Sequence, residues 1–232
     1  MQERIRGLLF DKDGTLFDFH NTWSVWCHAF ITQISNRDQA LADRLALKLG
    51  FNLDKCAFER SSLVIAGTLE ALVDATSEVL ADLDPAEIRA GIIETGRAAK
   101  MAPVVPLVPL LDGFQKAGLV LGVATNDAEL PAREQLQTEG IHDHFAFIAG
   151  YDTGHGAKPE AGMLLAFCEA VGLEPGEVAM IGDSTHDLHS GAAAGMVRVG
   201  VLTGPATHED LAPHADVVFP NIGHLPSWLG HH

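Results

Sequence analysis

Basic residues are scarce in this sequence. Its 232 residues include 15 lysines and arginines against 31 aspartates and glutamates, which gives a formal net charge of -16 at pH 7. Nucleic acids and anionic membrane surfaces are bound through basic patches. We therefore expect neither kind of partner. A phosphorylated substrate would need its positive charge supplied locally, by a metal ion and a few placed lysines.

Cysteines and long apolar runs are also scarce. No uncharged apolar stretch approaches the roughly 18 residues that a membrane helix needs. The apolar run near the N-terminus stops at Asp11, which is not typical of a secretory signal. The cysteines are far apart and odd in number, and are expected to be reduced thiols: Cys27, Cys56 and Cys168. These features predict a cytoplasmic protein. His231 and His232 are interpreted as a tag remnant without a role.

Hydrophobic residues make up 47% of the chain, enough for a buried core, and many of them fall in short runs. The runs are typical of buried strands and lie at 5–10, 119–124, 145–149, 178–181, 197–202 and 217–219. Segments of helical length lie between the later runs, at 128–138, 160–171 and 185–194. This alternation predicts an α/β protein, with a doubly wound parallel sheet and helices on both faces.

Residues 18–102 break the alternation. They carry helical patterns at 22–34, 37–49, 68–80 and 85–100, without convincing strands. Asp84, Pro85 and Glu87 are typical of a helix start. Helices packed on the sheet as part of one domain are the alternative, but a parallel crossover rarely needs so many of them. The prediction is a core domain of residues 1–17 and 103–232, interrupted by a helical domain of residues 18–102. Three prolines are interpreted as punctuating the return to the core: Pro103, Pro106 and Pro109.

An acidic motif, Asp11-Lys12-Asp13-Gly14-Thr15, follows the first strand directly. Ligands of open parallel sheets bind beyond the carboxyl ends of the strands, so Asp11 and Asp13 are expected at that crevice. Two carboxylates one residue apart suit a nucleophile and an acid/base. The ordinary alternative is an acidic turn, since Asp-Gly is a frequent turn dipeptide. Lys12 is expected to point away from the crevice and to have a structural role.

Polar residues also follow three other predicted strands. Thr125 and Asn126 offer a hydroxyl and amide donors for phosphate, Lys158 follows a glycine-rich stretch, and Asp183 and Asp187 end the 178–181 run. Each has an ordinary interpretation as a helix cap or a solvated charge, but their gathering at one edge of a sheet favours a site. The hard carboxylate ligands favour Mg²⁺. Three nearby histidines lack a recognisable zinc spacing: His155, His186 and His189.

The four polar segments, in this order, resemble the four motifs of the haloacid dehalogenase superfamily. The helical insertion resembles the cap of its phosphoglycolate phosphatase-like members. The resemblance implies that Asp11 is the nucleophile and a metal ligand. It implies that Asp13 protonates the leaving oxygen and then deprotonates water, while its backbone carbonyl touches the metal.

The resemblance also assigns the remaining motif residues. Thr125 binds the phosphoryl oxygens, and Lys158 bridges Asp11 and the phosphate. Asp183 completes the Mg²⁺ site and Asp187 supports it. The predicted function is a Mg²⁺-dependent phosphatase that hydrolyses a small phosphorylated metabolite through an aspartyl-phosphate, with phosphoglycolate as the leading substrate.

Other functions of the same superfamily stay open to different degrees. A phosphosugar mutase shares the core machinery. A dehalogenase is disfavoured because halide needs no proton from Asp13. A phosphonate hydrolase would need a lysine on the cap, for which three are available: Lys48, Lys55 and Lys100. A binding protein without turnover is disfavoured by the complete set of motif residues.

The inserted helical domain is expected to contribute the specificity contacts. Basic residues on helices are more often solvated, but three of them could meet a second anionic group of the substrate: Arg60, Arg97 and Lys100. No feature of the sequence indicates the oligomeric state.

Overall fold

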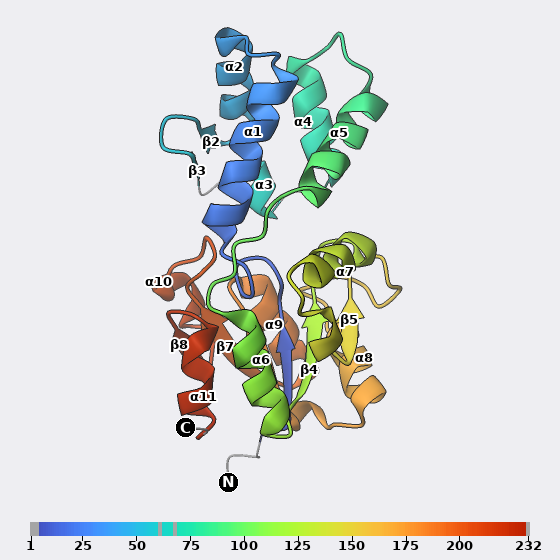
Figure 1. Ribbon diagram of the computed structural model, residues 1–232, viewed down its shortest axis with the longest axis vertical. Helices are drawn as coiled ribbons and strands as arrows, with labels where there is room; N and C mark the ends of the chain where they lie inside the picture. The colour runs from blue at the N-terminus through green and yellow to red at the C-terminus, as the bar shows by residue number, and fades with distance from the viewer. Residues whose placement is uncertain (1–4, 60–61, 67–68, 231–232) are drawn as a thin grey trace. The chain divides into compact units, whose positions relative to one another are not determined.

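The computed structural model describes residues 5–59, 62–66 and 69–230. The chain divides into two compact units (Figure 1). The core unit is Met1–Phe19 with Met101–His232, and the helical unit is His20–Lys100. Arg60, His231 and His232 lie outside the described residues.

The core unit is built on a six-stranded sheet in the order β5-β4-β1-β6-β7-β8, with every neighbouring pair parallel. Its strands are β1 (Gly7–Phe10), β4 (Val120–Ala124), β5 (Phe147–Ala149), β6 (Val178–Gly182), β7 (Val197–Val201) and β8 (Val217–Phe219). The chain runs outward from β1 to β5 on one side, then from β6 to β8 on the other. The carboxyl end of β1 is therefore the switch point at which such sheets bind ligands. The predicted doubly wound parallel sheet is confirmed.

Helices cover both faces of this sheet. Successive side chains of β1 point to opposite faces, so each face has apolar side chains that pack against a helix. Phe10 stacks on Phe114 of α6, with ring centroids 6.4 Å apart. Leu9 belongs to a buried cluster with Met163 and Phe167 of α8 on the other face. The helices of this unit are α6 (Leu107–Lys116), α7 (Glu129–Thr138), α8 (Gly162–Val171), α9 (Thr185–Ala194), α10 (His208–Leu211) and α11 (Leu225–Trp228).

Helix α6 was not predicted, because its sequence is rich in proline. Pro106 immediately precedes the helix and Pro109 lies in its first turn. A helix lacks internal partners for its first N–H groups, so proline loses no hydrogen bond there. Leu107, Leu111 and Phe114 then follow at helical spacing and are all buried.

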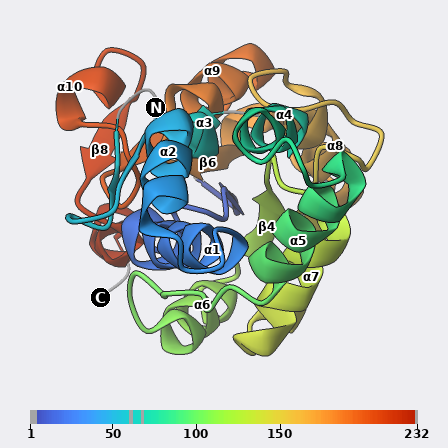
Figure 2. The same ribbon diagram turned by 90° about the horizontal axis from the view of Figure 1, so that it is seen from above.

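The helical unit contains η1 (His20–Ser24), α1 (Val25–Ile34), α2 (Gln39–Leu49), α3 (Leu63–Ala66), α4 (Leu69–Val79) and α5 (Pro85–Arg97). Each of α1 and α4 packs against both α2 and α5, as the view in Figure 2 shows. Asp84 caps α5 by accepting a hydrogen bond from the backbone N–H of Ala86. The expectation of no strands here was wrong, because β2 (Phe51–Asn52) and β3 (Ala57–Phe58) form a short antiparallel hairpin.

Within the described part of the chain, every helix is too short or too polar to cross a lipid bilayer.

Candidate active site

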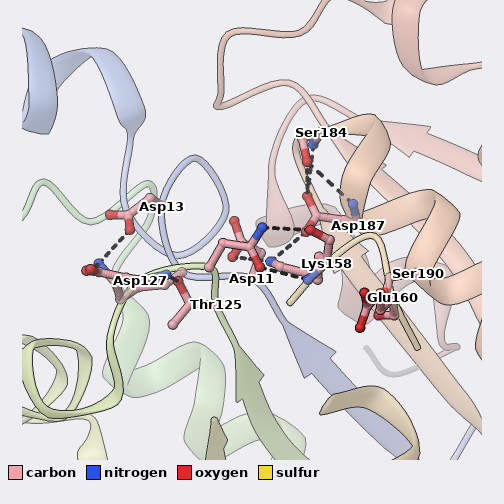
Figure 3. Close-up of polar contacts among 11 residues, drawn as sticks. Asp11, Asp13, Thr125, Asp127, Lys158, Glu160, Ser184, Asp187 and Ser190 are labelled. Atoms are coloured by element: carbon pink, nitrogen blue, oxygen red, sulfur yellow. Dashed lines mark hydrogen bonds and ion pairs between the residues drawn. The ribbon is translucent and has the colours of Figure 1, made fainter. Parts of the chain in front are cut away.

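Asp11 lies directly after the central strand β1. Its backbone N–H donates to the carbonyl of Ile181 on β6, at 2.8 Å, which continues the strand pairing by one residue. Its side chain is buried, and its Oδ1 lies 2.6 Å from Lys158 Nζ (Figure 3). Burial raises the pKa of Asp11 to about 6, although Lys158 acts in the opposite direction. The carboxylate thus sits where a ligand of this sheet would bind, with a cation in contact.

The ammonium group of Lys158 is shared between two carboxylates. Its Nζ lies 2.6 Å from Asp11 Oδ1 and 2.7 Å from Asp187 Oδ1, and all three side chains are buried. Burial alone would lower the pKa of Lys158, but the two carboxylates outweigh it and raise this pKa above its usual range. Lys158 therefore supplies a fixed positive charge beside Asp11.

The backbone around Lys158 is held from two sides. The side-chain amide of Asn126 donates to the carbonyl of Lys158 at 2.9 Å and accepts from its N–H at 2.8 Å. The hydroxyl of Ser190 on α9 donates to the carbonyl of Glu160 at 2.6 Å. Both heteroatoms of the Asn126 side chain are thus engaged with Lys158, so this amide acts on the position of the lysine.

Asp187 connects the start of α9 to Lys158. Ser184 is the N-cap of this helix, and its N–H and hydroxyl donate to Asp187 Oδ2 at 3.0 and 2.7 Å. This reciprocal pairing at a helix start is a capping box. Asp187 Oδ1 contacts Lys158 at the same time, so both carboxylate oxygens have a partner.

Asp183 is enclosed by two glycines. Gly14 has a φ of +81°, and a Cβ placed on it would lie 2.4 Å from Asp183 Cγ. A Cβ on Gly204, in the loop after β7, would lie 1.6 Å from Asp183 Oδ2. The two loops are tied together, since the hydroxyl of Thr203 donates to the carbonyl of Gly14 at 2.6 Å. Only glycine leaves room for the Asp183 carboxylate at these two positions.

Three of these carboxylates form a group that could hold a metal ion. One oxygen each of Asp11, Asp183 and Asp187 lie within 4.8 Å of one another, and all three residues are buried. Burial, then Asp11, raises the pKa of Asp183 well above its usual range. Lys158 contacts two of the three carboxylates, while Asp183 forms no ion pair with any residue that the structure describes. A hard divalent cation fits this all-oxygen set and would offset its excess charge.

A second polar group surrounds Asp13. Asp13 Oδ2 lies 2.6 Å from Lys12 Nζ, and Asp127 Oδ2 lies 3.4 Å from the same atom. The buried hydroxyl of Thr125 accepts from the N–H of Asp127 at 3.0 Å. Figure 3 shows Asp13 and Asp127 on one side of Asp11, and Lys158 on the other.

Sequence reasoning missed several members of these two groups. It gave Lys12 only a structural role, whereas its ammonium group contacts Asp13. A lysine between two aspartates, at the end of an apolar strand, was the available signal. Asp127 and Ser184 adjoin predicted site residues and could have been noticed for that reason. No local signal pointed to Gly204.

Among the described residues, the histidines near the motifs lie outside the group of carboxylates that could hold a metal ion. The ring of His155 lies 6.3 Å from that of Phe147, between centroids. His189 Nε2 lies 3.2 Å from His214 Nδ1. His186 is exposed on α9.

Comparison with known proteins identifies the class of this chain. It is a hydrolase by its match to a family model, that of the haloacid dehalogenase-like hydrolases, over residues 5–195. The match covers most of the sequence. The chain therefore belongs to the haloacid dehalogenase-like hydrolase family, and the resemblance expected from its motifs is confirmed.

Curated relatives of similar length carry phosphatase names. The chain is 31% identical to a probable phosphatase, IndB, of Dickeya dadantii, over 88% of this chain and 84% of the relative. It is 31% identical to a phosphoglycolate phosphatase of Chromobacterium violaceum, over 96% of each chain. It is 28% identical to an N-acetylmuramic acid 6-phosphate phosphatase of Pseudomonas aeruginosa, over 93% of this chain and 90% of the relative.

Solved structures show the same fold at lower identity. A putative β-phosphoglucomutase of Thermotoga maritima superposes with a TM-score of 0.72, at 18% identity, over 97% of this chain and 99% of that one. At this identity the likeness concerns the fold alone.

Proposed function

We propose that this protein is a Mg²⁺-dependent phosphatase that hydrolyses a small phosphate monoester through an aspartyl-phosphate on Asp11. The observation that carries the proposal is the buried contact between Asp11 and Lys158, beside a group of carboxylates able to bind a cation. The relatives that share about 30% identity over nearly the whole chain are named as phosphatases, which supports the same reaction class.

In this proposal Asp11 attacks phosphorus. Lys158 contacts Oδ1 of Asp11, which fixes the carboxylate in one orientation before the substrate arrives. Its ammonium group also offsets charge on the transferred phosphoryl group, which is what phosphoryl transfer chiefly requires of a protein. Thr125 is proposed to donate to the phosphoryl oxygens. The side-chain amide of Asn126 holds the backbone of Lys158. Asn126 is also proposed to bind the substrate, and that contact would not involve its side-chain amide.

Asp13 is proposed to be the acid/base of both steps. It would give a proton to the leaving oxygen when Asp11 attacks, and take one from the water that later hydrolyses the aspartyl-phosphate. The carboxylates of Asp11, Asp183 and Asp187 and the backbone carbonyl of Asp13 would hold Mg²⁺. When bound, this ion would supply positive charge beside that of Lys158.

Hydrolysis of p-nitrophenyl phosphate tests the reaction class. We expect turnover with Mg²⁺ and its loss in EDTA, restored when excess Mg²⁺ is added back. Inorganic phosphate should be released in step with p-nitrophenol at steady state. Undiminished turnover in EDTA would contradict the metal requirement, and absence of phosphate release would contradict the reaction class.

We propose phosphoglycolate as the leading substrate and the helical unit as the part that selects it. Relatives named for phosphoglycolate and for a sugar 6-phosphate are about equally similar to this chain, so a panel must contain both kinds of ester. The highest kcat/KM is expected for 2-phosphoglycolate. A chimera in which residues 20–100 of this chain are replaced by the corresponding segment of the Pseudomonas aeruginosa relative should shift the preference towards sugar 6-phosphates. An unchanged profile in the chimera would assign selectivity to the core unit.

A methyl group at Gly204 should weaken metal binding. The Cβ of a Gly204→Ala variant would lie 1.6 Å from Asp183 Oδ2, so the carboxylate or its loop must move. We expect the Mg²⁺ concentration for half-maximal activity to rise on the order of 10- to 100-fold, as for other changes behind a metal ligand. Gly113→Ala on α6 is the matched control, since a Cβ there meets nothing within 4 Å. Equal Mg²⁺ requirements in both variants would contradict the proposed place of Asp183.

A further inference from the structure

Lys12 is a lysine whose whole side chain is buried, with an exposed fraction of 0%. Lysine is almost never fully buried unless it is paired. Its Nζ donates to Gln135 Oε1 at 2.6 Å and lies 2.6 Å from Asp13 Oδ2 and 3.4 Å from Asp127 Oδ2. Two carboxylate oxygens and one amide oxygen thus surround this nitrogen, and all three come from different residues.

The acceptors of this ammonium are themselves held in place. Gln135 lies on α7 and is buried, with 4% of it exposed. Asp127 Oδ1 accepts from the N–H of Ala128 at 2.9 Å, and its own N–H donates to Thr125 Oγ1. An ammonium group has three N–H donors. Two separate elements, α7 and the loop after β4, thus contact Lys12 Nζ, and the same Nζ contacts Asp13 Oδ2.

Stability of the fold is a weak explanation for this arrangement. Ion pairs in protein interiors can often be replaced by apolar side chains without loss of stability. Leu8 and Phe10, earlier in the same segment, are buried apolar residues. An apolar residue at position 12 would need no polar partners from α7 or from the loop after β4. The distinctive consequence of lysine here is its contact with Asp13.

We propose that Lys12 is a positioning residue, which holds the Asp13 carboxyl group in the direction needed for proton transfer. This inference rests on the proposed role of Asp13 as acid/base. Proton transfer falls off steeply when donor and acceptor are misplaced by an ångström. Without the Lys12 contact, Asp13 would remain in the site but spend less time in the productive orientation.

A pair of aryl phosphates with different leaving groups tests the proposal. Phenyl phosphate needs a proton on its leaving oxygen, while p-nitrophenyl phosphate barely does. The ratio of kcat/KM for p-nitrophenyl phosphate to kcat/KM for phenyl phosphate therefore rises when the acid is impaired. In Lys12→Met we expect kcat/KM to fall on the order of tenfold or more for phenyl phosphate and to stay within about threefold for p-nitrophenyl phosphate. The ratio should therefore rise, as it should in Asp13→Asn.

A merely structural role predicts a different result. Misfolding would lower the number of active sites and therefore both kcat/KM values by the same factor, which would leave their ratio unchanged. An unchanged ratio in Lys12→Met, with a raised one in Asp13→Asn, would overturn the positioning role alone. An unchanged ratio in Asp13→Asn would overturn the proposed acid, and the positioning role with it.

Two further variants complete the test. Gln135→Met removes one anchor of Lys12 and leaves both charges in place, so a smaller rise of the ratio, about threefold, is expected. It decides the question if Lys12→Met fails to fold, since an unchanged ratio would then overturn the proposal. Lys116→Met, at an exposed lysine of α6, should leave the ratio and both kcat/KM values unchanged.

Discussion

Replacing Asp11 or Asp13 with asparagine should stop the reaction at two different points. Asp11→Asn removes the proposed nucleophile, so no phosphoenzyme should form and turnover should fall on the order of 10⁴-fold or more. Asp13→Asn leaves Asp11 and its contact with Lys158 intact, and should reduce turnover on the order of 10²–10⁴-fold. Both losses would be large, so the intermediate distinguishes the two roles better than the rate does.

The two chemical steps depend on Asp13 unequally when the substrate is p-nitrophenyl phosphate. Its leaving group is stable as an anion, so the attack by Asp11 needs little help from an acid. Water is a poor nucleophile at phosphorus, so hydrolysis of the aspartyl-phosphate still needs a base. Asp13→Asn should therefore release one equivalent of p-nitrophenol in a burst and then stall as a phosphoenzyme.

Rapid quenching and peptide mapping would measure this intermediate. With labelled phosphate, the label in Asp13→Asn should map to Asp11 and be released by hydroxylamine, as an acyl phosphate is. Asp11→Asn should show neither burst nor label. Asp143→Asn, at a fully exposed carboxylate, is the control and should behave as the unaltered protein. Label on Asp13, or normal turnover by Asp11→Asn, would contradict the assignment of roles.

The sheet and the motif positions were predictable because the sequences of buried parallel strands are short apolar runs. Each run ends where the chain leaves the sheet, and parallel strands end at one edge, so the residues that follow are brought together. Asp11 and Asp183 were found in this way, since β1 and β6 are neighbours in the sheet. The family resemblance added the roles, which neither the spacing nor the strand order provides.

Other features depend on tertiary contacts that leave little trace in the local sequence. The helix α6 was missed because Pro109 is unfavourable in a helix except in the first turn, where it lies. The hairpin of β2 and β3 was missed because its strands have only two residues each. The contact between Lys12 and Asp13 was not predicted, because the alternation of a strand does not extend into the turn after it. Gly204 lies outside the four motifs, and a side chain there is excluded by a tertiary contact, since its Cβ would meet the Asp183 carboxylate.

The buried carboxylates are expected to destabilise the metal-free protein. Asp11, Asp183 and Asp187 are close together, and Lys158 is the cation in contact with two of them. The pKa of Asp11 is about 6, against the usual 3.8. Ionising Asp11 therefore costs roughly 3 kcal/mol more in the folded protein than in the unfolded chain. Because the raised pKa belongs to the folded state, this penalty is absent below about pH 3.8 and fully present above about pH 6.

Asp183→Asn should therefore stabilise the metal-free protein while abolishing its response to Mg²⁺. Asparagine has the shape of aspartate without its charge, so the Gly14 and Gly204 loops need not move, and the repulsion with Asp11 is removed. In EDTA at about pH 7.5, the variant should melt several degrees Celsius above the unaltered protein, and the gap should narrow towards about pH 5 as the carboxylates are protonated. Added Mg²⁺ should raise the melting temperature of the unaltered protein, because the ion binds only the folded state, and should leave that of the variant unchanged.

Asp82→Asn, at an exposed carboxylate, is the control. It should have the same melting temperature and the same response to Mg²⁺ as the unaltered protein. If Mg²⁺ stabilised Asp183→Asn as much as the unaltered protein, Asp183 would not be a ligand. If the variant were less stable in EDTA at every pH, the buried charges would be balanced by contacts other than a metal ion.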